Sequence, residues 1–173
     1  GFKHINGPQT WDALAKARFA AQWLDAERKR REEGASDALT LADITQRMGD
    51  KHDTIFRIAT ASYALHQAEP EGLFQVADRA PKTFSFSHLY TALTYPEIRD
   101  FVGMPPSSRS SEPVHDPVPK THFDSFQQLL LWLYGSSSRG LDPVIRTQAK
   151  DLGRLKRVIG SSRALPMLMA SGD

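Results

Sequence analysis

The chain of 173 residues contains no cysteine. Disulfides, thiol catalysis and thiolate-ligated zinc or iron–sulfur sites are therefore excluded, and we expect a protein of the reducing cytoplasm. Long apolar runs are also missing. The longest, LLLWLY at 129–134, is far shorter than the roughly 20 residues that a helix needs to cross a bilayer, so no membrane partner is expected.

A dominant charge and the usual catalytic motifs are absent as well. The 22 Lys and Arg residues nearly balance the 20 Asp and Glu residues, so only the local distribution of charge can indicate a partner. The sequence contains no phosphate loop, dinucleotide fingerprint or nucleophile elbow, and its six histidines form no i, i+4 pair. We expect no enzymatic activity within these residues, no cofactor and no metal site.

Segments with strand periodicity are missing too, whereas apolar residues recur at helical spacing along most of the chain. This pattern predicts an all-α protein with a multi-helix domain containing a helix-turn-helix, followed by a small C-terminal helical bundle. Five prolines and four serines between Gly103 and Thr121 predict a flexible or extended linker. The predicted divisions are the tail of an upstream domain (1–9), the helix-turn-helix domain (10–102), the linker (103–122) and the C-terminal region (123–173).

The stretch LADITQRMGDKHDTIFRIATASYAL, at 41–65, has the pattern of two helices joined by a short turn. The Thr40 hydroxyl can cap a helix over 41–48, with Asp43 completing a capping box. Gly49 would end that helix, and a second would begin near 50–53 and continue to about Gln67. A further helical piece is expected at EGLFQVADR, residues 71–79.

In a helix-turn-helix the second helix presents its first side chains to the bases, while the first helix approaches the DNA backbone. Lys51, His52, Thr54 and Arg57 would point outward from the second helix. The residues placed to meet the backbone from the first helix are Thr40 and Arg47. The departures from the usual pattern are Thr45 at a position that favours a smaller residue, the acidic Asp50 and Asp53, and the bulky Phe56.

Residues 12–102 resemble the central DNA-binding region of ParB-type partition proteins and their KorB-like relatives. The resemblance lies in the order and spacing of a long lead-in helix, LTLADITQRMG, DKHDTIFRIATASYAL and KTFSFSHLYTAL. It implies a bacterial protein that binds double-stranded DNA. In that family the segment matching 84–93 helps to hold DNA phosphates, which implies the same role for Ser87 and His88, although Tyr90 stands near the expected arginine. No residues of this chain resemble the family's upstream nucleotide-binding domain.

Other interpretations remain open. Symmetric DNA sites usually require a dimer, so a homodimer through the C-terminal helices is expected. Alternatively, the helix-turn-helix is degenerate, and the chain is a protein-interaction or oligomerisation module in which Phe56, Asp50 and Asp53 face a partner. The chain could then be the targeting or regulatory part of a larger nuclease or defence protein.

Two basic segments lie outside the helix-turn-helix. ERKRREEG, at 27–34, mixes both signs of charge and is typical of a solvated helix end, although it could also bind phosphate. RTQAKDLGRLKR, at 146–157, concentrates Arg146, Lys150, Arg154, Lys156 and Arg157 against the single acid Asp151. It is either a solvated surface or a second, sequence-independent DNA contact.

Overall fold

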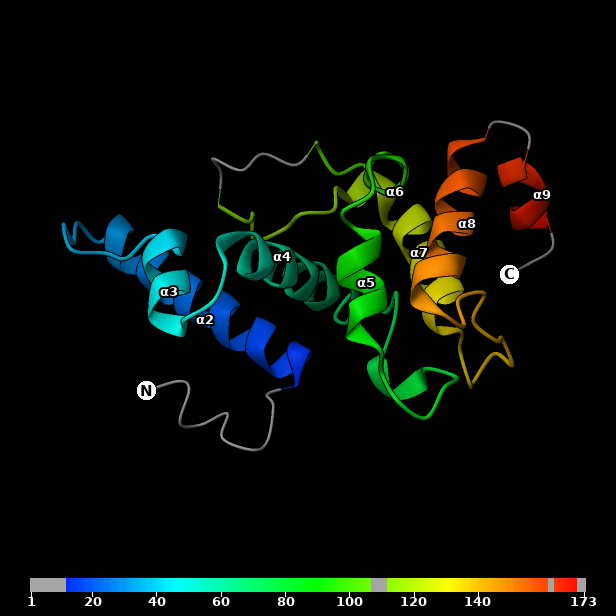
Figure 1. The fold of residues 1–173 in the computed structure, drawn as a ribbon, viewed down its shortest axis with the longest axis horizontal. Coiled ribbons are helices and arrows are strands. Elements are labelled where there is room, and N and C mark those ends of the chain that lie inside the picture. The colour runs from blue at the N-terminus through cyan, green and yellow to red at the C-terminus, as the bar shows by residue number, and fades with distance from the viewer. Residues whose placement is uncertain (1–11, 107–111, 162–163, 171–173) are drawn as a thin grey trace. The chain divides into compact units, whose positions relative to one another are not determined.

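A computed structural model describes residues 12–106, 112–161 and 164–170, and these parts of the chain are helical (Figure 1). They contain no strand, only an isolated bridge between Ser136 and Leu141, which confirms the prediction of an all-α protein. None of the described helices is long and apolar enough to cross a membrane. The predicted tail, residues 1–9, lies outside the described residues.

The α-helices are α2 (Ala13–Glu32), α3 (Leu41–Met48), α4 (His52–Ala68), α5 (Phe86–Ala92), α6 (Pro96–Phe101), α7 (Phe123–Tyr134), α8 (Gln148–Gly160) and α9 (Ala164–Ala170), with 3₁₀ turns η1 (Val76–Asp78) and η2 (Lys120–His122).

The described residues form two compact units. The first contains α2, α3, α4 as far as Tyr63, and residues 112–115, and the second contains the rest of α4 together with α5 to α9. The chain therefore passes between the units inside α4 and again within the proline-rich stretch, between His115 and Asp116. The division of the chain at 103–122 into two domains stays a prediction.

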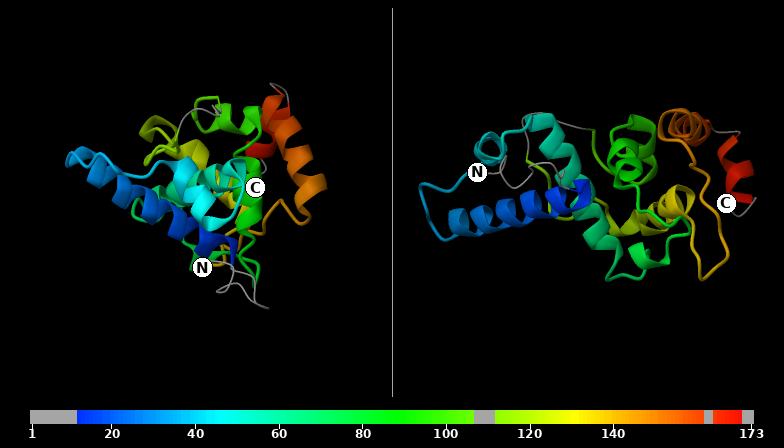
Figure 2. Two further views of the ribbon diagram at one scale, coloured as in Figure 1. Left: turned by 60° about the vertical axis from the view of Figure 1, so that its left-hand side comes forward. Right: turned by 60° about the horizontal axis from the view of Figure 1, so that its bottom comes forward.

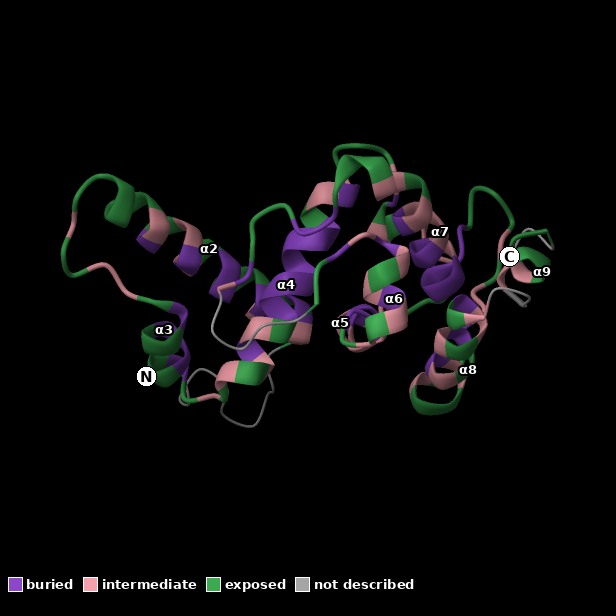
Figure 3. Ribbon diagram, turned by 90° about the horizontal axis from the view of Figure 1, so that it is seen from above, coloured by how far each residue is buried: buried purple, intermediate pink, exposed green. Residues whose placement is uncertain are grey.

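The first unit is built on apolar stripes at helical spacing. Leu14, Ala17 and Leu24 are buried along α2, and Leu41, Ile44 and Met48 are buried on α3. Figure 3 shows these buried faces together with that of α4, whose central part is buried on all sides. Within the first unit, the exposed positions of α4 lie only in its first two turns, and this limits where the helix can meet a ligand there.

The second unit has its core around α7. Phe126, Leu129, Leu130 and Trp132 are fully buried there, and α5 packs against both α7 and α8. Helices α6 and α9 also contact α8, and the views in Figure 2 show α8 and α9 side by side. The apolar face of α8 therefore points into this unit, while its other face is available to solvent.

The predicted helix at 71–79 is wrong, because the chain there forms only the 3₁₀ turn η1. Gly72, in the turn that follows α4, has a φ of 69°, a left-handed conformation that a continuous helix does not contain. The Asp78 carboxylate then accepts hydrogen bonds from the backbone N–H (2.9 Å) and hydroxyl (3.0 Å) of Ser138. Long-range bonds thus hold this segment in a non-helical path.

Part of the proline-rich stretch packs against helices. Within the second unit, the side-chain amide of Gln67 accepts from the N–H of Val118 and donates to its C=O, both at 2.9 Å. Val118 itself is 1% exposed. Residues 112–115 are held in the first unit by contacts described below, and residues 107–111 lie outside the described residues.

Candidate nucleic-acid interface

Helix α3 begins with the capping box that its sequence predicted. The N–H of Asp43 donates to the Thr40 hydroxyl at 3.3 Å, and the Asp43 carboxylate accepts from the N–H of Thr40 at 2.9 Å. Hydrogen bonds from the backbone and hydroxyl of Thr40 lower the pKa of Asp43. Because Thr40 also donates its one hydroxyl hydrogen to Asp43 at 2.9 Å, that hydroxyl can accept from a ligand but cannot donate without opening the cap.

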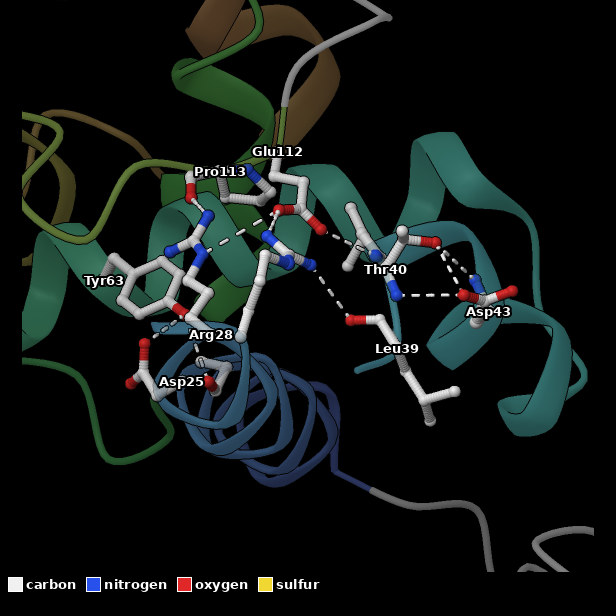
Figure 4. A network of polar contacts seen from close by, with 11 residues as sticks. Asp25, Arg28, Leu39, Thr40, Asp43, Tyr63, Glu112 and Pro113 are labelled. Atoms are coloured by element: carbon white, nitrogen blue, oxygen red, sulfur yellow. Dashed lines mark hydrogen bonds and ion pairs between the residues drawn. The ribbon is translucent and has the colours of Figure 1, made fainter. Parts of the chain in front are cut away.

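A carboxylate from the proline-rich stretch completes the start of α3 (Figure 4). Glu112 accepts from the N–H of Leu41 at 2.8 Å and forms ion pairs with Arg31 at 3.3 Å and Arg28 at 4.0 Å. Arg28 also donates to the carbonyl of Pro113. A negative charge at the first turn of a helix interacts favourably with the helix dipole, so Glu112 stabilises the start of α3 and holds its own segment there.

The phenol of Tyr63 joins α4 to α2 in the same network. Its oxygen lies 3.0 Å from the carbonyl of Ala21 and 2.8 Å from the carboxylate of Asp25, and the Arg28 guanidinium lies 6.0 Å from the centre of its ring. Burial and the bond to Asp25 raise the pKa of Tyr63, so the phenol stays neutral and donates. Helix α4 is thereby fixed against the lead-in helix.

The turn between α3 and α4 has the geometry that Gly49 was expected to provide. Gly49 ends α3 with a φ of 71° and a ψ of 33°, a left-handed conformation that other residues adopt only at a cost. The chain then enters α4 at His52, three residues later. Two helices joined by a short connection that contains a glycine are the arrangement that the sequence predicted.

Asp50, one of the acidic residues that disfavour DNA, is paired inside the first unit. Its carboxylate bonds to the ammonium of Lys16 on α2 and accepts from the N–H of Lys51 at 2.9 Å. Partial burial raises the pKa of Asp50, but the bonds from Lys16 and Lys51 outweigh that effect and leave the pKa below its usual value. The negative charge of Asp50 in this turn is therefore neutralised by Lys16.

The first two turns of α4 project polar side chains. Asp53 and Arg57 are exposed on the face opposite the buried Ile55 and Ile58, and Thr54 is half-buried on one flank. On the other flank the rings of His52 and Phe56 stack, with their centres 6.2 Å apart. The predicted contacts in the first unit are thus exposed at Thr40, Arg47, Lys51 and Arg57 and half-buried at His52 and Thr54.

Ser87 and His88, the remaining predicted contacts, are half-buried on α5 in the second unit. The imidazole of His88 stacks on Tyr134, with ring centres 6.4 Å apart, beside a pocket of about 410 Å³. Burial lowers the pKa of His88, and Asp151 only partly opposes this. The side chain is therefore neutral near pH 7 and suited to a hydrogen bond more than to an ion pair with phosphate.

The arginines of the segment 27–34 have partners within the first unit. Arg30 bonds to Glu27 at 2.8 Å and to Asp37 at 2.6 Å, and Arg31 donates to the carbonyl of Leu39 at 3.2 Å. Together with the contacts of Arg28, these bonds support a structural role for this segment. Among the described residues, no group of three or more His, Asp or Glu side chains could hold a metal ion.

Two residues of this region, Lys16 and Glu112, were not recognised from the sequence. Lys16 lies 34 positions from Asp50, and Glu112 lies 71 positions from Leu41. No spacing rule connects residues so far apart. No protein-family model, curated protein or solved structure matches this chain, so a function has to follow from the chemistry of its own residues.

Proposed function

We propose that this chain binds double-stranded DNA through a ParB-like helix-turn-helix, with the first two turns of α4 in the major groove. The observation that carries the proposal is the pattern of exposure on α4. Arg57 and Asp53 point outward, Lys51 precedes them in the turn, and every position from Ile58 to Leu65 is buried. A recognition helix likewise reads bases with its N-terminal residues.

The first unit supports this use of α4 by holding it firmly. The Tyr63 phenol, the left-handed Gly49 and the Lys16–Asp50 pair act at three places along the helix-turn-helix. A rigid scaffold keeps an arginine in the position that a base edge or a phosphate requires. Arg57 is the residue suited to a guanine edge, while Lys51 and Arg47 are suited to phosphates. A homodimer through the C-terminal helices stays a prediction.

The test is binding of fluorescent duplex DNA to the full chain, followed by anisotropy across a salt series. Arg57→Ala should weaken binding by about tenfold, because one arginine contact contributes about 1–3 kcal/mol. Arg139→Ala, which removes an exposed arginine from a loop of the second unit, is the matched control and should bind like the wild type. Asp53→Asn should tighten binding, since it removes a negative charge one turn before Arg57.

The form of the loss assigns the role of Arg57. An equal loss on all sequences, with a salt slope reduced by about 1, identifies a phosphate contact, whereas a loss confined to some sequences identifies base recognition. The proposal fails if wild-type affinity is independent of salt or if Arg57→Ala binds DNA unchanged.

One observation favours a second candidate, a protein-interaction module. Phe56 is a half-exposed aromatic residue on the outward part of α4. Aromatic anchors of this kind dominate protein interfaces. If this candidate is correct, Phe56→Ala abolishes binding to a partner protein, whereas duplex DNA binds neither to the wild type nor to the variant.

A further inference from the structure

Helix α8 has one apolar face and one cationic face. Leu152, Leu155 and Ile159 are buried in the second unit. At 3.6 residues per turn, Lys150, Arg154 and Arg157 lie on the opposite side of the helix, and all three are exposed. These three residues are called the α8 stripe.

The other charges of α8 lie on its flanks and are engaged locally. Lys156 places its ammonium 5.0 Å from the centre of the Tyr95 ring. The Asp151 carboxylate accepts from the backbone N–H groups of Arg146 and Thr147, both at 2.7 Å, and these bonds lower its pKa. Arg154 contributes to the lowered pKa of Asp151, and Arg157 donates to the carbonyl of Gly153 at 3.3 Å. The outward face of α8 itself contains three exposed cations and no acid.

The length of the α8 stripe matches a nucleic-acid backbone. Arg157 lies seven positions after Lys150, which corresponds to about 10 Å along the helix. Each strand of duplex DNA carries one phosphate per about 3.4 Å of the duplex axis, so a helix that lies along this axis passes about three phosphates of one strand over this length. Three cations thus face about three anions.

We infer that the α8 stripe is a second, sequence-independent contact to the phosphate backbone of duplex DNA. This inference rests on the proposed function for the choice of duplex DNA as the polyanion. It adds a DNA contact in the second unit, whereas the proposed contacts of α4 lie in the first. Its role is to add salt-dependent affinity through release of counterions, while α4 supplies any recognition of bases.

The composition of the stripe favours a polyanion over a protein partner. The outward positions of α8 contain no large apolar side chain, whereas protein interfaces depend on buried aromatic and aliphatic anchors. The exposed Met167 and Met169 on α9 make an anionic lipid surface the competing partner. A vesicle arm in the experiment separates these two partners.

The test compares the full wild-type chain with the triple variant Lys150→Gln/Arg154→Gln/Arg157→Gln. Glutamine keeps the helix propensity of these positions, and the circular dichroism spectrum verifies the fold. Anisotropy with duplex DNA of random sequence is measured from 50 to 200 mM salt. The slope of log affinity against log salt should fall by about 2–3, because three phosphate contacts each contribute about 0.9. Over this range the wild type should lose about 40-fold more affinity than the variant.

Two further variants make the outcome specific. Lys82→Gln/Lys120→Gln/Arg139→Gln removes the same charge from exposed positions of the second unit and should leave the slope within about 1 of the wild type. Arg57→Ala should keep the part of the salt slope that the α8 stripe contributes. If Arg57→Ala binds unchanged while the stripe variant loses its slope, the helix-turn-helix proposal fails and the α8 stripe stands.

The inference is overturned if the stripe variant and the charge-matched variant have the same slope. It is also overturned if the stripe variant keeps its affinity for DNA but loses binding to vesicles of phosphatidylcholine with 30% phosphatidylserine, about the charge of an anionic membrane.

Discussion

At the scale of single residues, Thr45 carries a hydroxyl into the core of the first unit. It is 4% exposed, and its Oγ1 has no hydrogen-bond partner among the described residues. A buried hydroxyl without a partner costs about 1–3 kcal/mol relative to one that is hydrogen-bonded. The same position was unusual in the sequence because a smaller residue is preferred where the two helices cross.

We predict that Thr45→Val stabilises the protein by about 1 kcal/mol, because valine keeps the shape of threonine and removes the hydroxyl. Urea unfolding should show the gain, and Tm should rise by about 2–4 °C for a chain of this length. Thr45→Ala is the control. It also removes the hydroxyl, but it leaves a small cavity and should be less stable than the valine variant. Destabilisation by valine would mean that the hydroxyl has a partner.

At the scale of secondary-structure elements, α3 depends on one local and one distant capping interaction. The capping box of Thr40 and Asp43 lies within four residues of chain, whereas Glu112 approaches the same helix end from 71 positions away. Eight residues are too few for a helix that is stable alone in water. The position of the turn at Gly49 therefore depends on both interactions.

Glu112→Gln should lower the free energy of unfolding by about 0.5–1 kcal/mol, since the amide can still accept from Leu41 but loses the charge at the helix end. Glu112→Ala should cost about 1–2 kcal/mol, because the N–H of Leu41 then has no acceptor from this side chain. Urea unfolding gives both values, and hydrogen exchange should be faster in α3 than in α7. High salt should reduce the difference between wild type and glutamine. An unchanged glutamine variant would show that the charge of Glu112 contributes nothing.

At the scale of the whole molecule, stability should fall in two steps as the solution is acidified. Burial lowers the pKa of His88 below its ordinary value of 6.5, so the unfolded chain takes up this proton first. Stability from His88 is complete above pH 6.5 and is lost as the pH falls toward the lowered pKa of the folded state. The free energy of unfolding should be measured by urea from pH 7.5 to 3.

The second step should begin near pH 3.8, the ordinary aspartate value, because Asp43, Asp50, Asp78 and Asp151 all have lowered pKa values in the folded chain. Their stability is present above that pH and is lost as the pH falls through the folded pKa values. His88→Asn should remove the first step and leave the second. If the variant still loses stability as the pH falls below 6.5, before the aspartates titrate, another group is responsible.

Much of the fold could be predicted from short-range chemistry. Helical spacing predicted the all-α class, and Thr40, Asp43 and Gly49 predicted both ends of α3, because a cap involves residues only three or four positions apart. The prediction of a helix at 71–79 was wrong because long-range contacts determine the structure there. Its path depends on hydrogen bonds that the Asp78 carboxylate accepts from Ser136 and Ser138, which are 58 and 60 positions away.

The sequence by itself determined that this protein is helical, where α3 begins and where the chain turns after it, and which residue types stand on each helix. Only the tertiary structure decided how the charges are used. It paired Asp50 with Lys16 and placed Glu112 at the start of α3. It also turned Lys156 toward Tyr95 and left Lys150, Arg154 and Arg157 exposed. The physical reason is range: helix periodicity and capping act within a few residues, whereas the pairing of a charge depends on which distant segments the folded chain brings together.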